Sequence, residues 1–200
     1  MKYRIITISR EFGSGGRTIG KVLADTLGYE YYDNELVAKI AEKSGLAESF
    51  IKESGEYANA TNGILFNFNN FGTMYNTTIQ DELYVIQRNL IKELAEASPC
   101  VIVGRCADYV LRDRSDCLNV FIHADIAFRA DRIVHLYGEK EDSPEKRVKD
   151  KDKRRKTYYK YYTNRHWGEA ANYHLCLNSG ELGIDTCVKL IKRLVKEETE

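Results

Sequence analysis

A glycine-rich turn near the start of the chain carries the residue types best suited to chemistry. Residues 5 to 27 read IITISREFGSGGRTIGKVLADTL, which is an apolar segment, the turn and then an amphipathic segment. Glycines let the backbone pass close to an oxyanion, and N–H groups at the start of a helix then point at that anion. Arg17 adds a full positive charge at the head of the predicted helix, and the neighbouring Thr18 hydroxyl can hold Mg²⁺. The pattern predicts a phosphate-binding turn made of Gly13, Ser14, Gly15, Gly16, Arg17 and Thr18.

The turn departs from the P-loop motif G-x-x-x-x-G-K-[ST] at two positions, although its order of strand, turn and helix is that of a P-loop. Counted back from Gly16, the first glycine of the motif falls on Glu11. The lysine of the motif is replaced by Arg17, which keeps the charge and adds a planar fork of donors. The alternative is a tight strand–helix turn that uses glycine for backbone reasons only.

Apolar and amphipathic segments alternate along the chain, which predicts a parallel α/β sheet. The predicted strands span residues 3–8, 30–32, 100–103, 117–122 and 173–177. The predicted helices span residues 16–27, 34–43, 106–111, 127–136, 145–162 and 184–195, with a long amphipathic helix that begins at residue 77. The segment 58–76 is rich in Asn, Gly and Phe, and it predicts either a mobile or substrate-contacting insertion or an irregular cover packed by its own aromatic rings.

Length and composition restrict the class of protein. A chain of 200 residues suits a single domain with a sizeable core. Thirty basic and thirty acidic residues cancel, so no global field favours nucleic acid or a membrane surface. No apolar run is long enough to span a bilayer, and the N-terminus lacks a secretory pattern. Five cysteines without a CxxC pair indicate neither a zinc site nor a disulfide framework, so we expect a cytoplasmic protein that binds neither nucleic acid nor membrane.

Polar residues follow each predicted strand, at the edge where ligands bind in open parallel sheets. Besides the glycine turn, these are Asp33, Gly104-Arg105, His123-Ala124-Asp125 and Asn178-Ser179. Arg105 is the strongest candidate among them, because a permanently charged, planar guanidinium group just after a buried strand suits bidentate phosphate recognition. The alternative for Arg105 is an ion pair with Asp108 or Asp125.

A second group of basic residues lies on two predicted helices. Arg129 and Arg132 share a helix face, and the next helix carries Lys151, Lys153, Arg154 and Arg155. A mobile basic lid of this kind could bring arginines over bound phosphates and exclude water. The alternative is a solvated charged helix with internal ion pairs, because acidic residues interleave with the lysines. The tyrosine run over 158–162 fits either base stacking or one amphipathic helix face.

Several of these segments resemble cytidylate kinases and, more closely, the cytidylate kinase-like family of bacterial proteins, over nearly the whole chain. The segments that carry the resemblance are ITISREFGSGGRTIG, LGYEYYDNELVAKIAE, VIVGRCADYVL, FIHADIAFRADRI and KDKDKRRKTYYKYYTNRHWGEAANYHLCLNS. The resemblance implies an α/β, three-layer P-loop fold with a five-stranded parallel sheet, a monophosphate-binding insertion and a helical lid. It implies a single domain over 1–200, with the substrate-side insertion and long helix at about 45–97 and the lid at about 137–165.

The resemblance also implies roles for residues on the donor and acceptor sides. Residues 13–18 would hold the donor phosphates of ATP, and Asp33 matches the acid at the end of the second strand. Lys39 falls where cytidylate kinases have a phosphate-binding arginine. Asp152 and Arg155 fall on the Asp-x-x-Arg pair of the lid, which contacts the monophosphate nucleotide in cytidylate kinases.

The remaining matches concern the third strand and the helix beside the lid. Arg105 matches the arginine of the Gly-Arg pair, and cytidylate kinases have Asp at the next position, where this chain has Cys106. Asp108 is the candidate replacement for that contact to the nucleoside. Arg129 and Arg132 match arginines beside the lid.

Together these patterns predict a phosphotransferase that uses ATP and Mg²⁺ and moves the γ-phosphoryl group to a monophosphate acceptor. Thr18 would help place the magnesium ion. The predicted catalytic residues are Arg17, Arg129, Arg132 and Arg155, and together with Arg105 they would offset charge in the transition state. One alternative is a nucleotide-binding regulatory module without turnover, and another is a kinase for a non-nucleotide small molecule. The aromatic-rich insertion could also serve as a contact surface between copies of the chain, so a homo-oligomer is a further possibility.

Overall fold

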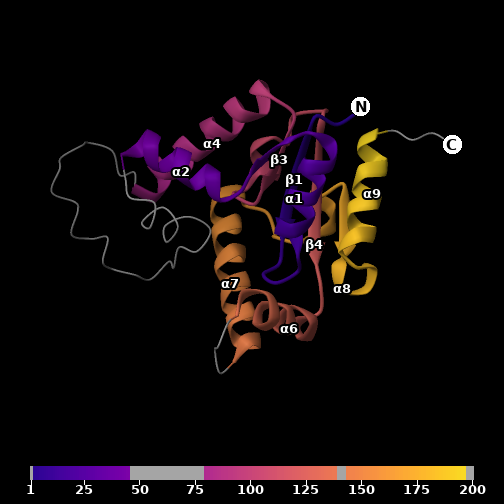
Figure 1. Cartoon of the computed structure of the whole chain (residues 1–200). Helices are drawn as coiled ribbons and strands as arrows, with labels where there is room; N and C mark the ends of the chain where they lie inside the picture. Colours follow the sequence, from indigo (N-terminus) through magenta and orange to yellow (C-terminus); the bar gives the residue numbers. More distant parts are fainter. Residues whose placement is uncertain (1, 46–78, 139–142, 197–200) are drawn as a thin grey trace.

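The computed structural model describes residues 2–45, 79–138 and 143–196, and these form a parallel sheet flanked by helices (Figure 1). The sheet has five strands in the order β2-β3-β1-β4-β5, and each neighbouring pair is parallel. The strands are β1 (Ile5–Arg10), β2 (Glu30–Tyr32), β3 (Cys100–Val103), β4 (Cys117–His123) and β5 (Leu175–Asn178). The predicted five-stranded parallel α/β fold is thereby confirmed.

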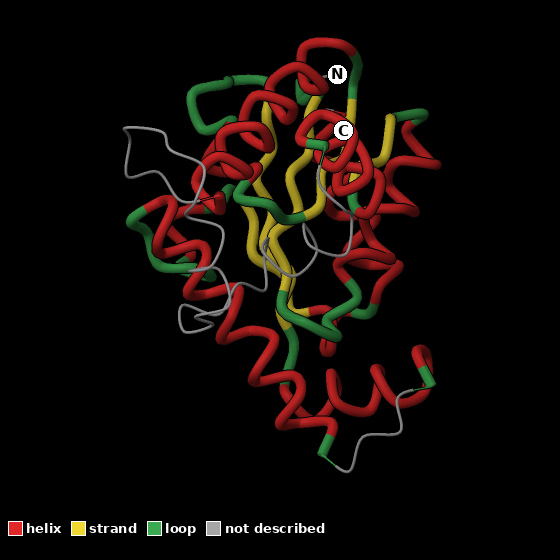
Figure 2. Tube along the Cα trace, turned by 90° about the vertical axis from the view of Figure 1, so that its left-hand side faces the viewer, coloured by secondary structure: helices red, strands yellow, loops and turns green. Residues whose placement is uncertain are grey.

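The helices cover both faces of the sheet (Figure 2). The longer ones are α1 (Gly16–Leu27), α2 (Asn34–Ser44), α4 (Ile79–Ala97), α6 (Ile126–Tyr137), α7 (Pro144–Thr163) and α9 (Ile184–Lys196). The short ones are α5 (Ala107–Val110), α8 (Ser179–Leu182) and the 3-10 helix η2 (Ala170–Asn172). Helices α6 and α7 pack together at the end of the sheet where the loop between β1 and α1 lies (Figure 1).

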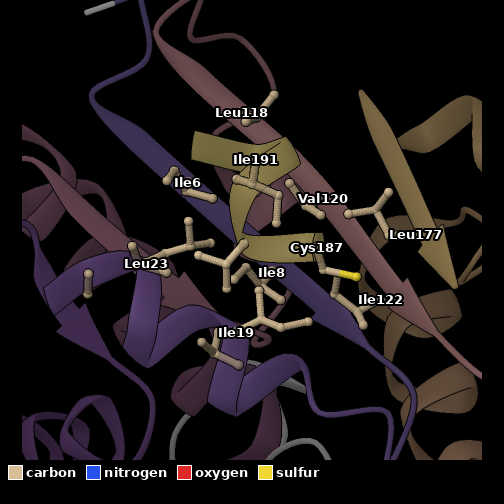
Figure 3. Packing of buried hydrophobic residues seen from close by; sticks show 14 of the residues in the cluster. Ile6, Ile8, Ile19, Leu23, Leu118, Val120, Ile122, Leu177, Cys187 and Ile191 are labelled. Carbon is tan, nitrogen blue, oxygen red and sulfur yellow. The ribbon is translucent and has the colours of Figure 1, made fainter. Parts of the chain in front are cut away.

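The two faces of the sheet bury separate apolar layers, because successive strand residues point to opposite sides. On one face, Ile6 and Ile8 of β1 pack with Ile19 of α1 and Ile191 of α9 (Figure 3). On the other face, Ile5 packs in a layer that includes residues of α2, α4 and α5. Both faces are covered, so the strands are nearly continuous apolar runs, as is usual for buried parallel sheets. The packing yields three layers of helix, sheet and helix.

The observed elements differ from the predicted ones chiefly at strand ends. Strand β1 was predicted over 3–8 but runs from Ile5 to Arg10, because Ser9 and Arg10 continue the pairing with β4. Strand β5 was predicted over 173–177 but runs from Leu175 to Asn178, and the short helices η2 and α8 were not predicted. The predicted insertion over 58–76 and the first residues of the helix expected from residue 77 lie outside the described residues.

Two further expectations concern cysteines and membranes. All five cysteines are free thiols. Burial raises the pKa of Cys100 and of Cys117 to about 12, so these thiols stay protonated and pack as small apolar residues. Among the described helices, none has both the length and the apolar composition that crossing a membrane requires.

Candidate functional site

The glycine turn lies between β1 and α1 and leaves the first N–H groups of α1 open. Helix α1 begins at Gly16, and its N-cap residue, Gly15, has no side chain that could cap the helix. The first N–H groups of a helix have no acceptor within the helix, and the helix dipole makes them attract anions. Gly13 and Gly15 have φ values of 82° and 81°, in the left-handed region that favours glycine. A Cβ at Gly13 would lie 2.7 Å from the Arg129 carbonyl oxygen, so the turn also packs too closely on α6 for a larger residue.

Two serine hydroxyls form hydrogen bonds with backbone carbonyl groups of the turn. The Ser14 side chain is fully buried, and its hydroxyl lies 2.9 Å from the Glu11 carbonyl oxygen. Ser179, one of the residues expected at a strand end, donates its hydroxyl hydrogen bond to the Ser14 carbonyl oxygen at 2.5 Å. The hydroxyls of these serines therefore support the backbone of the turn, and Ser14 can contact a phosphate only through its backbone.

Glu11, which replaces the first glycine of the motif, is turned toward the connection between β4 and α6. Its Oε2 atom accepts from the Ala124 N–H at 3.2 Å and lies 3.4 Å from Arg129 Nε. The negative charge of Glu11 is therefore offset by a buried arginine. This arrangement accounts for how an acidic residue is accommodated at the first glycine position of the motif.

Arg17 and Arg10 flank the carboxylate of Asp33, which follows β2. Arg17 Nε forms an ion pair with Asp33 Oδ2, and Arg10 Nη2 lies 3.9 Å from Asp33 Oδ1. Burial acts to lower the pKa of Arg17, but the charge and hydrogen bond of Asp33 together with Tyr31 outweigh it and raise the pKa, so the guanidinium stays charged. The Arg17 side chain is 46% exposed, whereas that of Asp33 is only 10% exposed. Arg17 therefore keeps room to move, and Asp33 is the fixed partner.

Arg10 is a site residue that motif matching missed. It is buried at the carboxyl end of β1, and a Cβ on Gly16 would clash with its side chain. The P-loop motif begins at the position of Glu11, so Arg10, the residue before it, lies outside the motif. The period of two along Ile6, Ile8 and Arg10 was the available signal, because it places Arg10 on the face covered by α1.

Arg105 follows β3 in an unusual backbone conformation. Gly104, Arg105 and Cys106 have φ values of 78°, 59° and 55°, and left-handed conformations are uncommon for residues other than glycine. Gln87 of α4 donates to the Arg105 carbonyl oxygen at 2.9 Å and so helps to fix this turn. Arg105 follows the carboxyl end of β3, and its side chain is buried. A strained turn held by its surroundings is common at functional sites.

Asp108 is buried in a hydrogen-bond network rather than exposed to a ligand. Its Oδ2 atom accepts from the Tyr159 hydroxyl at 2.7 Å, and its Oδ1 atom lies 3.4 Å from the Ser9 hydroxyl. Burial raises the pKa of Asp108, and the Tyr159 hydrogen bond opposes that rise only in part. The network links the end of β1 to α7 through α5.

Cys106 packs against tyrosines of the run over 158–162. It belongs to a buried cluster with Tyr158 and Tyr159, against which Tyr84 and Tyr162 also pack. The Tyr84 and Tyr162 rings are stacked, with centroids 4.0 Å apart. The tyrosines of this run thus lie on a buried face of α7, and their rings pack against other aromatic rings of the protein. Position 106, where cytidylate kinases have Asp, is filled by this packing.

The predicted site residues on helices α6 and α7 contact the P-loop and the ends of the elements that flank it. Arg129 Nη1 lies 2.5 Å from Asp152 Oδ2, and Asp152 Oδ1 accepts from the Phe12 N–H at 2.8 Å. Arg155 Nη1 donates to the Arg10 carbonyl oxygen at 2.9 Å. Arg132 Nη2 donates to Thr18 Oγ1 at 3.1 Å. The structure therefore brings residues from α6 and α7 onto both ends of the turn.

Lys39 differs from the other predicted residues. Its side chain is exposed on α2, and the described structure records no hydrogen bond or ion pair between Lys39 and the other candidates. Thr18, the predicted magnesium ligand, is also exposed but is hydrogen-bonded to Arg132. Among the described residues, no group of three or more His, Cys, Asp or Glu side chains could hold a metal ion. A single hydroxyl suits Mg²⁺ that arrives with phosphates and keeps several waters, provided that Arg132 releases Thr18.

Comparisons with known proteins agree with this geometry. The model of the cytidylate kinase-like family matches residues 5–181. A cytidylate kinase from Archaeoglobus fulgidus is 27% identical over 197 residues, covering 96% of this chain and 94% of that protein. The structure of an uncharacterized protein from Eubacterium ventriosum has a TM-score of 0.73 and 26% identity, and the match covers 97% of this chain and 99% of that one. Shikimate kinase from Acinetobacter baumannii has a TM-score of 0.56 and 16% identity, over 99% of this chain and 96% of that one, which shows a shared fold alone.

Proposed function

Because the chain belongs to the cytidylate kinase-like family, we propose that it is a phosphotransferase that moves the γ-phosphoryl group of ATP to a small monophosphate acceptor. The observation that carries this proposal is the position of Arg17, which heads α1 in the P-loop and reaches Asp33 at the end of β2. The donor loop and the side expected to bind the acceptor thus meet at one charged contact. Ligands in open parallel sheets bind at this edge.

On the donor side, we assign the phosphates to the backbone of Gly13, Gly15 and Gly16 and to the Arg17 side chain. These N–H groups lie in the turn and at the start of α1, where the helix dipole attracts anions. Bound Mg·ATP supplies the phosphoryl group that is transferred. Thr18 offers its hydroxyl to the magnesium ion, and Arg132, which holds that hydroxyl at 3.1 Å, is then free to turn to the phosphates.

On the acceptor side, we assign recognition to the residues at the carboxyl ends of β1, β2 and β3. Asp33 can accept a hydrogen bond from an acceptor group, and the buried guanidinium of Arg105 suits a phosphate. Arg10 joins them because it lies 3.9 Å from Asp33. The strands that carry these residues are neighbours in the order β2-β3-β1. Lys39 remains a candidate at the outer side of the acceptor site.

Transfer itself requires little covalent chemistry from the protein, because phosphoryl transfer depends on positioning and on neutralising charge. Arg17 and Arg132 are the arginines placed to offset the charge that develops on the transferred group. Arg129 and Arg155, which were also predicted to be catalytic, donate to backbone carbonyls of the loop and of β1. We therefore assign them to positioning the loop.

A regulatory module that binds nucleotide without turnover is the second candidate. The observation that favours it is again the ion pair between Arg17 and Asp33, because donor phosphates must compete with this carboxylate for Arg17. A kinase for a non-nucleotide acceptor is a further alternative, since tyrosine packing fills the position where cytidylate kinases contact the nucleoside. These candidates differ in whether they transfer a phosphoryl group and in the acceptor that takes it, so one experiment separates them.

The experiment is calorimetric titration with Mg·ATP, CMP, dCMP, UMP, AMP and GMP, with a coupled phosphotransfer assay on the same panel. Turnover on a monophosphate supports the proposed function and names the acceptor. Binding of Mg·ATP without turnover on the monophosphates, or on a panel of sugars, small acids and nucleosides, supports the regulatory module. Turnover only on that second panel identifies a non-nucleotide kinase. A protein that binds none of the nucleotides contradicts the proposal.

A further inference from the structure

The peptide groups of Phe12, just before the first glycine of the loop, are held on both sides by a buried ion pair. Asp152 Oδ1 accepts from the Phe12 N–H at 2.8 Å, and Arg129 Nη1 donates to the Phe12 carbonyl oxygen at 3.2 Å. The ring is closed by Arg129 Nη1 and Asp152 Oδ2, which are 2.5 Å apart. The side chains of Arg129 and Asp152 are only 8% and 9% exposed. Loop, α6 and α7 therefore meet in one closed set of hydrogen bonds.

This ring fixes the backbone at the point where the loop must begin to curve. Hydrogen bonds to ionised groups are stronger than neutral ones, and a buried ion pair is stable only when its remaining hydrogen bonds are also made. Gly13 comes next, with φ of 82°, and it packs against the Arg129 carbonyl oxygen. A shift of Phe12 would therefore move the glycines that follow it.

The contacts of Asp152 point to the donor side of the site rather than to the acceptor side. Both of its oxygens are engaged by the ring, one with Phe12 and the other with Arg129. Arg155, one turn further along α7, donates to the Arg10 carbonyl oxygen, and its guanidinium lies 5.7 Å from the centre of the Phe12 ring. In cytidylate kinases, by contrast, the matching Asp-x-x-Arg pair contacts the monophosphate nucleotide.

We propose that Asp152 is a positioning residue for the donor nucleotide, which it serves by holding Phe12 and Arg129 and thereby setting the path of the P-loop. The inference rests on the proposed function only for the identity of the donor, Mg·ATP. It also implies that α7 stays packed on the loop during binding, because Asp152 and Arg155 attach the helix to two points of the segment from Arg10 to Phe12.

The test compares two substitutions at Asp152 with a control on the same helix. Asp152→Asn keeps an oxygen that accepts from the Phe12 N–H but removes the charge that pairs with Arg129. Asp152→Ala removes both interactions. Asp150→Asn is the control, because Asp150 is exposed on α7. Amide hydrogen exchange across residues 9–18 reports the loop directly, and calorimetry with Mg·ATP and with CMP reports the two halves of the site.

We expect Asp152→Ala to speed exchange at the Phe12 amide and to weaken Mg·ATP binding, each by about tenfold, which is the usual weight of one lost charge-assisted hydrogen bond. Asp152→Asn should have a smaller effect of the same kind, and Asp150→Asn should match the wild type. Binding of CMP should change far less than binding of Mg·ATP. If Asp152→Ala does not fold, the same two measurements on Asp152→Asn decide the question.

Three outcomes would overturn the inference. Unchanged exchange and unchanged Mg·ATP binding in both variants would show that Asp152 does not set the loop. Loss of CMP binding with Mg·ATP binding intact would return Asp152 to the acceptor side. Equal effects from Asp150→Asn would show that any loss of charge on α7 suffices. If the wild type binds no Mg·ATP, the proposed function fails, and the exchange measurement still decides whether Asp152 positions the loop.

Discussion

Arg17, which occupies the position of the P-loop lysine, forms an ion pair with Asp33 at the carboxyl end of β2. The two residues belong to segments that the fold places side by side, the head of α1 and the turn that precedes α2. In the proposed reaction, donor phosphates would compete with Asp33 for Arg17, and an acceptor that binds Asp33 would release Arg17 toward the donor. The pair thus couples the two halves of the proposed reaction through one shared charge.

Arg17→Ala should abolish most turnover while leaving the fold intact. Removal of one positioned group that stabilises transition-state charge costs a factor of about 100 to 1,000 in kcat. The side chain is 46% exposed, so the free energy of unfolding should fall by about 1 kcal/mol or less. A phosphotransfer assay and thermal unfolding measure the two effects.

Lys21→Ala is the matched control for that experiment. Lys21 lies one turn further along α1 and pairs with Asp25 at 2.8 Å on the exposed side of the helix. It should keep wild-type turnover. Wild-type turnover in Arg17→Ala as well would count against the assignment of Arg17 to the donor phosphates.

Asp33→Asn should separate donor binding from transfer. The substitution removes the charge that holds Arg17, so Mg·ATP should bind a few-fold more tightly, because phosphates no longer compete with a carboxylate. The acceptor loses a recognition group, and kcat/KM for the acceptor should fall by about tenfold or more. Calorimetry and steady-state kinetics measure these changes. Weaker binding of Mg·ATP in Asp33→Asn would show that Asp33 supports the donor site instead.

Sequence patterns predicted the P-loop and α1 well, because a period of 3.6 and two glycines mark that helix at both ends. The predicted span of 16–27 agrees with the observed helix from Gly16 to Leu27, which ends at the left-handed Gly28. The same reasoning ended β1 too early, since Ser9 and Arg10 are polar residues of the kind that usually begin a loop. Pairing with β4 keeps them in the strand, and each is buried on a different face of the sheet; neither effect can be read from local composition.

The spacing of residues in the sequence did not predict which groups the charged side chains contact. Spacing placed Arg129 and Arg132 on one helix face, and the structure shows that one binds the Phe12 carbonyl while the other binds Thr18. The resemblance to cytidylate kinases placed Asp152 on the acceptor side, but it is close packing of α6 and α7 that decides which atoms it meets. Such tertiary contacts depend on segments far apart in the chain.

Gly15→Ala should destabilise the protein more than Gly28→Ala, although both residues are in the left-handed region. Alanine in that region costs about 1–2 kcal/mol. A Cβ at Gly28 meets nothing within 4 Å, whereas a Cβ at Gly15 would clash with Ile184. Because only the tip of the Ile184 side chain has to move, Gly15→Ala should lose about 1 kcal/mol more than Gly28→Ala, and it should also weaken Mg·ATP binding. Urea unfolding and calorimetry measure these effects.

Ile184→Ala in the Gly15→Ala background tests the cause. If the clash is responsible, the double variant should be more stable than additivity of the single variants predicts. Strict additivity would show that the backbone conformation alone explains the cost.

The buried carboxyl group of Asp108 should make stability depend on pH. Burial raises its pKa, so between the ordinary value of about 3.9 and the higher folded value the folded state binds more protons than the unfolded state. Stability contributed by this group is therefore lost as the pH rises through the folded pKa. Asp108→Asn keeps an oxygen for the Tyr159 hydroxyl and removes the titration, so it should gain stability relative to the wild type as the pH rises.

Urea unfolding at a series of pH values measures this difference, which should reach about 1.4 kcal/mol for each tenfold change in the acid constant of Asp108. Asp113→Asn is the control, because the Asp113 side chain is 83% exposed. If the variant instead gains stability relative to the wild type as the pH falls, the folded pKa of Asp108 is lowered rather than raised.

The most direct test of the proposed activity is to follow the γ-phosphoryl group itself. Mg·ATP labelled at the γ-phosphate would be incubated with the protein and with each of CMP, dCMP, UMP, AMP and GMP, and the products separated. The account predicts label in one nucleoside diphosphate with the wild type and its near-complete loss with Arg17→Ala. Binding of Mg·ATP by the wild type without label in any of these acceptors would contradict transfer to a nucleoside monophosphate.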